Sequence, residues 1–200
     1  MQQITVEINI DLDDTAIDTN PVMRKLLTVA GSPPREDEDW IIMSEHGEHG
    51  ERILREAKFM HMAGPRPGWA ALPVWVEAIK QRYPGRVNFR YLTHRGYHPL
   101  GEQYSKVALR RSAMDSIPLV CICPNKHPSK AQWLVANGSH TVTHILADDF
   151  NKLSQVPNHP NVLGIVADQP WNQQLTGMPL FKTFREFTDI CEKLLANLLR

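Results

Sequence analysis

The stretch Ile4-Thr5-Val6-Glu7-Ile8-Asn9-Ile10-Asp11-Leu12-Asp13-Asp14-Thr15 decides the fold of this 200-residue chain. Its first half alternates apolar and polar side chains, which is typical of a strand with one buried face. The run stops at Asp11 and Asp13, whose carboxylates can converge where the strand becomes a loop. Hard oxygen ligands of this kind suit Mg²⁺ beside a phosphate. The stretch therefore predicts a phosphoryl-transfer site, with a solvated acidic turn or a helix cap as the alternative.

Strand-like and helix-like segments alternate along the whole chain, which predicts an α/β fold with a Rossmann-like parallel sheet and crossover helices. We expect strands at 4–10, 87–92, 118–123, 143–147 and 162–167. We expect helices at 21–30, 51–61, 69–82, 99–114, 128–136 and 180–199.

About seventy residues separate the first two expected strands, far more than one crossover requires. We therefore expect a small helical cap at 16–63, inserted into a core formed by 1–15 and 64–200. Such a cap would cover the carboxyl ends of the strands, where open α/β sheets bind ligands. Its apolar residues are candidates for substrate contacts, with packing inside the cap as the alternative for each: Trp40, Ile41, Met43 and Phe59.

Three later segments contain the groups that phosphoryl transfer requires. The second expected strand runs into Thr93-His94-Arg95, a lysine stands at 130, and the strand expected at 143–147 runs into Asp148-Asp149. In this order, and together with Asp11-x-Asp13-x-Thr15, they resemble the four motifs of the haloacid-dehalogenase-like phosphatase superfamily.

Finer matches resemble the 5′(3′)-deoxyribonucleotidase branch of that superfamily. They are Lys130-x-x-Trp133, Pro65-Arg66-Pro67-Gly68 and Asp168-Gln169-Pro170-Trp171-Asn172. The chain departs from the branch at Asp14, where the branch usually has Gly, and at Thr93-His94-Arg95, where it usually has Thr-Ser-Pro. Both departures bear on substrate choice more than on reaction type.

The resemblance implies a Mg²⁺-dependent phosphomonoesterase that forms an aspartyl-phosphate intermediate. Asp11 would be the nucleophile, and Asp13 the general acid and then the general base. Asp11, the backbone carbonyl of Asp13, and Asp148 would hold the metal. Asp149 would orient Lys130 or a metal-bound water, or cap a helix from Phe150.

The phosphoryl oxygens require hydrogen-bond donors and positive charge. Thr93 offers a hydroxyl group and Lys130 an ammonium group, with Lys106 and Lys126 as competing lysines. His94 and Arg95 would add phosphate or sugar contacts, with a structural role as the alternative for the histidine. We expect Thr15 to support the turn by local hydrogen bonding.

The expected substrates are deoxynucleoside or nucleoside monophosphates. Another small phosphorylated metabolite and the 3′-phosphate of a nucleic-acid end are the alternatives within the same chemistry. A binding module without catalysis is the alternative outside it, but Asp11 and Asp13 are both present.

Composition narrows the class of partner. Lys and Arg total 22, as do Asp and Glu, so the formal net charge is +0. A protein that binds duplex nucleic acid usually has an excess of clustered basic residues, which this sequence lacks. The sequence lacks an apolar run of membrane-spanning length and a signal-like start, so a cytoplasmic protein without a membrane partner is expected. The chain has three cysteines, of which Cys121 and Cys123 are expected as reduced core residues. Together with His127 these two lack the spacing of a zinc site. A homodimer is compatible with the sequence.

Overall fold

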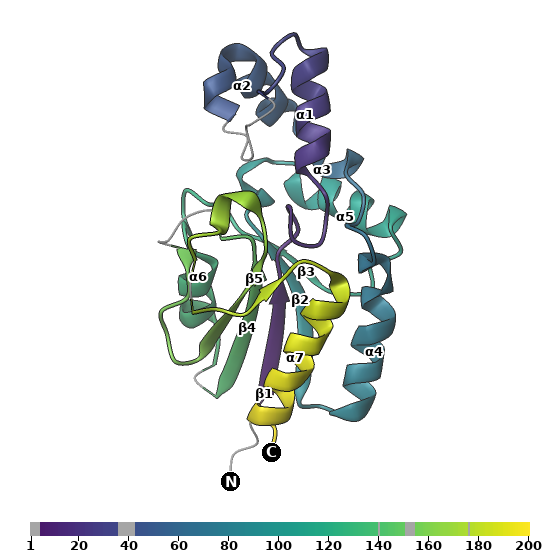
Figure 1. Cartoon of the computed structure of the whole chain (residues 1–200), viewed down its shortest axis with the longest axis vertical. Helices are drawn as coiled ribbons and strands as arrows, with labels where there is room; N and C mark the ends of the chain where they lie inside the picture. Colours follow the sequence, from purple (N-terminus) through teal and green to yellow (C-terminus); the bar gives the residue numbers. More distant parts are fainter. Residues whose placement is uncertain (1–4, 36–42, 140, 151–154, 176) are drawn as a thin grey trace.

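The computed structural model describes residues 5–35, 43–139, 141–150, 155–175 and 177–200. Six parallel strands form one sheet at its centre, in the order β3-β2-β1-β4-β5-β6 (Figure 1). The strands are β1 (Thr5–Ile10), β2 (Val87–Thr93), β3 (Leu119–Cys121), β4 (Val142–Asp148), β5 (Val162–Ala167) and β6 (Leu180–Phe181). The predicted α/β class and parallel sheet are confirmed.

Helices connect the strands. They are α1 (Asn20–Val29), α2 (Gly47–Glu56), α3 (Phe59–Met62), α4 (Leu72–Arg82), α5 (Gly101–Arg111), α6 (Lys130–Asn137) and α7 (Phe184–Leu198). Short 3₁₀ turns lie at η1 (Met43–His46), η2 (Trp69–Ala71), η3 (Arg95–Tyr97) and η5 (Pro170–Asn172).

Two helix predictions were wrong in their extent. The helix expected at 51–61 begins earlier and is interrupted, because Ala57 adopts a left-handed conformation with φ of 50° between α2 and α3. The helix expected at 180–199 begins only at Phe184, after strand β6. A capping box explains this start, since Thr183 Oγ1 accepts from the Glu186 amide and the Glu186 side chain accepts from the Thr183 amide.

The alternation in β1 places its side chains on two faces of the sheet. Val6, Ile8 and Ile10 are fully buried in the larger core, which η2, α4 and α7 complete with Trp69, Val76, Phe187 and other residues. The opposite face carries a smaller apolar cluster that includes Leu134 of α6. Helices therefore cover both faces, as expected for a parallel sheet.

Helices α1 and α2 lie beyond the carboxyl ends of the strands, and α3 packs on α5 (Figure 1). These three helices and η1 share a separate apolar cluster built from Met23, Leu27, Met43, Ile53, Ala57, Phe59 and Met60. These helices lie within residues 16–63, where the sequence predicts a helical cap, and we call them the cap below. The division of the chain into core and cap stays a prediction. Trp40 and Ile41 lie outside the described residues.

Candidate active site

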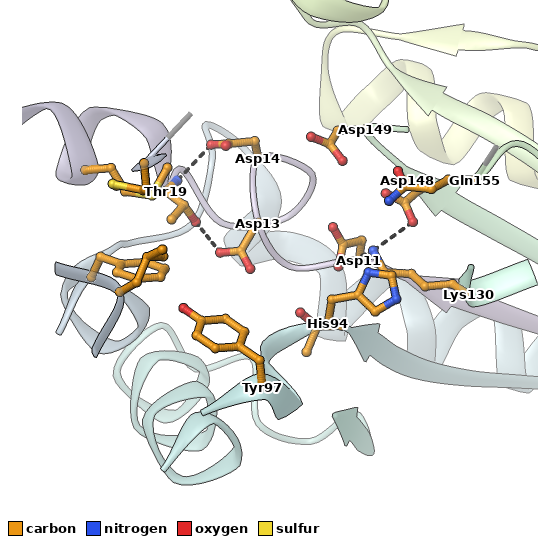
Figure 2. A pocket seen from close by; sticks show the side chains of 15 residues that line it. Asp11, Asp13, Asp14, Thr19, His94, Tyr97, Lys130, Asp148, Asp149 and Gln155 are labelled. Carbon is orange, nitrogen blue, oxygen red and sulfur yellow. Dashed lines mark hydrogen bonds and ion pairs between the residues drawn. The ribbon is translucent and has the colours of Figure 1, made fainter. Parts of the chain in front are cut away.

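Four charged side chains meet at the carboxyl edge of the sheet. Lys130 Nζ lies 2.8 Å from Asp11 Oδ1 and 2.7 Å from Asp148 Oδ2. Carboxylate oxygens of Asp11, Asp148 and Asp149 all lie within 4.8 Å of one another. We call these four buried residues the edge cluster. The structure thus brings together residues from three of the motifs recognised in the sequence (Figure 2).

The strand register explains this convergence. Ile10, the last residue of β1, pairs with Tyr91 of β2 and with Ala147 of β4. The next residues, Asp11 and Asp148, therefore leave their strands at the same level. Lys130 joins them from the first turn of α6, which starts there because Ser129 Oγ accepts from the backbone amide of Gln132.

The edge cluster holds three carboxyl groups but one ammonium group. Burial raises the pKa of Asp11 to about 7, although Lys130 acts in the opposite direction. Burial, and then the neighbouring Asp148, raise the pKa of Asp149 well above its ordinary value. Burial disfavours the Lys130 cation, but Asp11 and Asp148 outweigh this effect and raise its pKa. Full ionisation of the carboxyl groups would leave negative charge that a bound cation could balance.

Asp13 lies beside the edge cluster and is held by other partners. Arg95 Nη2 donates to Asp13 Oδ1 at 2.7 Å, and Arg95 Nε donates to Asp13 Oδ2 at 3.0 Å. Thr19 Oγ1 also donates to Asp13 Oδ1, at 2.7 Å. Burial favours the neutral acid, but Arg95 and Thr19 outweigh it and lower the pKa of Asp13.

Asp14 occupies the position where the deoxyribonucleotidase branch usually has glycine. Its φ is 52°, in the left-handed region that glycine adopts freely and Asp tolerates better than most residues. Asp14 Oδ1 accepts from the backbone amides of Thr19 and Asn20 at 3.0 and 2.8 Å, at the start of α1. Burial raises the pKa of Asp14 to about 7. Asp14 therefore adopts the left-handed conformation that glycine would also adopt, and its carboxylate accepts hydrogen bonds at the start of α1.

A cavity of about 260 Å³ opens beside the edge cluster. Figure 2 shows Lys130 and Asp148 at one end of it and Thr19 and Tyr97 at the other. The expected residues Thr93, His94, Met43 and Phe59 line it. So do five residues that the sequence reading missed as substrate contacts: Thr19, Met23, Leu54, Tyr97 and Gln155. Tyr97 could have been suspected, because it follows Thr93 by four residues in the same loop.

Thr93 and His94 extend from the end of β2 into this cavity. Thr93 Oγ1 is buried and has no hydrogen-bond partner among the residues that the structure describes. The His94 ring Nε2 lies 2.9 Å from the carbonyl oxygen of His127. Burial, and then Lys130, lower the pKa of His94, so its ring is neutral near pH 7. An unpaired buried hydroxyl beside a lysine is a place where an anionic ligand would gain hydrogen bonds.

Arg95 does not lie where we expected it. It is 1% exposed and is absent from the cavity lining. Its guanidinium group contacts Asp13, the Met60 carbonyl oxygen and Ser105 Oγ. The expected phosphate or sugar contact of Arg95 is therefore wrong, because the turn at η3 directs its side chain beneath the loop instead of into the cavity.

Of the three candidate lysines, Lys130 alone belongs to the edge cluster. Lys106 is exposed on α5 and pairs with Glu102 at 2.5 Å, and Lys126 is exposed after β3. The local hydrogen bonding expected of Thr15 comes from its backbone amide, which donates to the Leu12 carbonyl oxygen at 3.3 Å. Its buried hydroxyl group has no hydrogen-bond partner among the described residues.

The segment after β5 supports the acidic loop. Asn172 Nδ2 donates to the backbone oxygen of Asp149 at 2.5 Å, and Trp171 Nε1 donates to Asp149 Oδ2 at 3.2 Å. Gln169 Nε2 donates to the backbone oxygen of Asp14 at 2.6 Å. Asp168 pairs with Lys182 at 3.1 Å and does not line the cavity.

The comparisons with solved structures identify the fold. A hydrolase from Pseudomonas syringae superposes with a TM-score of 0.54 at 10% identity, over 96% of this chain and 99% of that one. A putative haloacid dehalogenase-like hydrolase from Burkholderia xenovorans LB400 gives 0.51 at 9% identity, over 96% and 99%. A haloacid dehalogenase-like family hydrolase from Xanthomonas campestris gives 0.50 at 12% identity, over 98% and 99%. This chain has the haloacid dehalogenase-like fold.

Neither a protein-family model nor a curated protein matches the sequence. The haloacid dehalogenase-like fold thus rests on structural likeness alone. A search of the described helices found none that is long and apolar enough to cross a membrane.

The edge cluster fits a hard divalent cation. Mg²⁺ prefers carboxylate oxygens, and Asp11, Asp148 and Asp149 form the one group of metal-capable side chains found among the described residues. The surplus of negative charge in the edge cluster supports the same assignment. The Asp13 carboxylate is directed toward Arg95 and Thr19, so only its backbone carbonyl could join this group. Asp149, expected in a supporting role, is placed as well as Asp148 to act as a ligand.

Proposed function

We propose that this chain is a Mg²⁺-dependent phosphomonoesterase that acts through an aspartyl-phosphate intermediate and prefers deoxynucleoside monophosphates. The observation that carries the proposal is the convergence of Asp11, Lys130 and Thr93 on one cavity, where the Thr93 hydroxyl lacks a partner among the described residues. A carboxylate nucleophile, a fixed cation and a free donor are the groups needed to attack and hold a phosphoryl group.

Asp11 would attack phosphorus through a carboxylate oxygen, and the bond between phosphorus and the ester oxygen would break. Lys130 lies 2.8 Å from Asp11 Oδ1, so it keeps the carboxylate in place and offsets charge on the transferring group. This matters because two unit charges 4 Å apart repel by about 4 kcal/mol at an effective dielectric constant of 20. Thr93 Oγ1 would donate to a phosphoryl oxygen.

Asp13 in its protonated form, which Arg95 and Thr19 disfavour because they lower its pKa, would give a proton to the leaving ester oxygen. A water molecule would then attack the phosphorus of the aspartyl phosphate, and Asp13 would take its proton. This step releases inorganic phosphate and restores the Asp11 carboxylate. The side chain of Asp13 is 34% exposed, so it can reach substrate from the cavity wall.

Asp11, Asp148 and Asp149 would hold Mg²⁺, with the Asp13 backbone carbonyl as a further oxygen ligand. When bound, the cation supplies positive charge that offsets the negative charge of the phosphate and of the edge cluster. The same three carboxyl groups disfavour full ionisation in its absence.

The organic part of the substrate would contact the cap. Met23, Met43, Leu54 and Phe59 give the cavity apolar surface, and Tyr97 adds a second aromatic ring. An aromatic ring can stack on a nucleobase, which is worth about 1–3 kcal/mol per base. This apolar lining supports a nucleotide over a bare sugar phosphate.

Steady-state phosphate release with Mg²⁺ tests the proposal. The panel contains deoxynucleoside 5′-monophosphates, the corresponding 3′-monophosphates, deoxyribose 5-phosphate and an aryl phosphate. We expect kcat/KM for the best nucleotide to exceed that for deoxyribose 5-phosphate by roughly ten- to hundredfold. Equal values would leave a phosphatase without nucleotide preference, and no release from any ester would refute the phosphatase.

Tyr97 offers a sharper substrate test than Phe59, because Phe59 is also part of the cap core. Tyr97 is 38% exposed and lines the cavity, so its replacement should disturb the fold little. Tyr97→Leu should lower kcat/KM for nucleotides and leave kcat/KM for deoxyribose 5-phosphate unchanged, so that the ratio of the two values falls. Tyr97→Phe keeps the ring and serves as the matched control. An unchanged preference in Tyr97→Leu would remove Tyr97 from the base site.

A further inference from the structure

Arg95 is a buried cation outside the edge cluster and outside the cavity lining. It is 1% exposed, which would be costly for an unpaired charge. Its position is explained by Asp13, because Nε and Nη2 both donate to that carboxylate. A planar guanidinium group with two donors fixes the plane of a carboxylate as well as its distance.

The turn around Arg95 is itself held firmly. Arg95 Nη1 donates to the Met60 carbonyl oxygen at 2.8 Å and to Ser105 Oγ at 3.2 Å. The next residue, Gly96, packs directly on the end of β3, since a Cβ there would lie 2.7 Å from the Ile122 carbonyl carbon. Gly96 N also donates to the Ile122 oxygen at 3.1 Å. These contacts therefore hold the Arg95 side chain in one position between the core and α3.

The contacts divide the two oxygens of Asp13. Oδ1 accepts from Arg95 Nη2 at 2.7 Å, from Thr19 Oγ1 at 2.7 Å and from Arg95 Nε at 3.2 Å. Oδ2 accepts from Arg95 Nε at 3.0 Å. Within the described part of the chain no further donor reaches Oδ2. Oδ1 is thus the anchored oxygen, and Oδ2 is the one with room for a proton or a substrate contact.

We propose that Arg95 is a positioning residue that anchors Asp13 Oδ1 and thereby presents Oδ2 as the atom that exchanges the proton with the leaving oxygen and the attacking water. This assignment rests on the proposed function, in which Asp13 is the general acid and base. Thr19 provides the second anchor. Arg95 does not touch the substrate in this role.

A double-mutant cycle between Arg95→Met and Asp13→Asn tests this role with deoxynucleoside monophosphates. Each single change should lower kcat by about a hundredfold or more, the scale of general acid–base catalysis, while KM changes less than about threefold. If Arg95 acts only through Asp13, the double variant should be no slower than Asp13→Asn alone. Arg95→Lys should recover only part of kcat, because an ammonium group cannot make both contacts.

Arg90→Met is the matched control, because Arg90 forms a partly buried ion pair with Glu7 away from the cavity. It should keep kcat while losing thermal stability. If Arg95→Met does not fold, as judged by thermal melting, Thr19→Val takes its place in the cycle and should likewise have no added effect on Asp13→Asn.

The outcomes separate the two proposals. Multiplicative losses in the double variant, or a loss confined to KM, would overturn the positioning role while leaving the phosphatase intact. Absence of phosphate release by the wild-type chain would instead overturn the proposed function, and the role of Arg95 with it.

Discussion

Two polar clusters, one buried and one partly buried, involve the same strands β1 and β4 and differ in what surrounds them. The edge cluster sits where β1 and β4 end and opens on a cavity of about 260 Å³. An inner cluster, formed by Glu7, Arg90 and His144, lies within β1, β2 and β4 beside α6. The Glu7 carboxylate pairs with Arg90 and lies 3.2 Å from His144 Nδ1. The adjoining cavity of the inner cluster is about 10 Å³, too small for a substrate.

Charge balance separates the clusters further. The inner cluster has one carboxylate and one guanidinium group, and Trp133 of α6 covers Arg90 with its ring centroid 5.7 Å from Arg90 Cζ. The two opposite charges of Glu7 and Arg90 therefore balance each other within the protein. The edge cluster has three carboxyl groups for one lysine. Burial of charge alone does not indicate a site, whereas unbalanced charge beside a cavity does.

The largest expected effect comes from Asp11→Asn. An amide of similar shape cannot form an acyl phosphate, so turnover should vanish while the fold survives, since the variant removes surplus negative charge. Phosphate release and thermal melting check both statements. Activity within about tenfold of wild type, an effect below ~1.4 kcal/mol, would refute Asp11 as the nucleophile.

Lys130→Met should raise the barrier by about 3 kcal/mol, because it removes the charge that faces the phosphoryl group. Lys106→Met is the matched control, since Lys106 is exposed and pairs with Glu102 on α5. The measurement is kcat/KM for both variants. A larger loss in Lys106→Met than in Lys130→Met would show that the wrong lysine has been assigned.

Asp148→Ala should weaken Mg²⁺ binding, since it removes one of few protein ligands. The Mg²⁺ concentration that gives half-maximal activity should rise by roughly ten- to hundredfold. A chelator should abolish activity in the wild type. Mg²⁺ titrations of activity and of melting temperature provide two readouts. An unchanged titration would move the metal away from Asp148 and make Asp149 the next candidate.

Glu7→Gln tests the inner cluster. It breaks the ion pair with Arg90 and should lower the free energy of unfolding by about 1.5 kcal/mol, the scale of a hydrogen bond to a charged group. The value of kcat should not change. Denaturant unfolding and phosphate release measure the two quantities. A large loss of activity with unchanged stability would show that the inner cluster contributes to catalysis.

The last prediction concerns the dependence of stability on pH. Burial, and then the charge of Arg90, lower the pKa of His144 to about 4, and the nearby Glu7 carboxylate is already paired with Arg90. In the unfolded chain this pKa is about 6.5, so the unfolded state binds more protons between these values. The contribution of His144 to stability is therefore present above about pH 6.5 and lost as the pH falls toward 4. His144→Asn should flatten that part of the curve relative to wild type, and parallel curves would contradict the assignment.

Part of the edge cluster could be expected on geometric grounds. Asp11 comes directly after β1 and Asp148 ends β4, and parallel strands of one sheet end at the same edge. The resemblance to the four motifs was still needed to single out Asp148. Lys130 could be assigned only through the motif, because the position of a lysine at the start of a helix does not show where its side chain points. The sheet was predicted from periodicity, except for β6, whose two residues are too few to show an alternating pattern.

The contact between Arg95 and Asp13 was beyond sequence reasoning. It joins two loops 82 residues apart through side chains whose direction depends on the close packing of Gly96 against β3. The cavity lining was also only partly predicted, since Met23 and Leu54 belong to helices whose apolar faces serve the cap core as well. The sequence marked Asp14 as a departure from the branch pattern, and its φ of 52° and its two amide contacts came from the structure.

The short outer strands of the sheet have a consequence for self-association. β3 has three residues and β6 has two, so each edge presents little unpaired backbone to a neighbouring chain. Continuous sheets between molecules, and the aggregation that follows from them, require longer exposed edges. If copies of this chain associate, helices and loops would therefore have to form the contact.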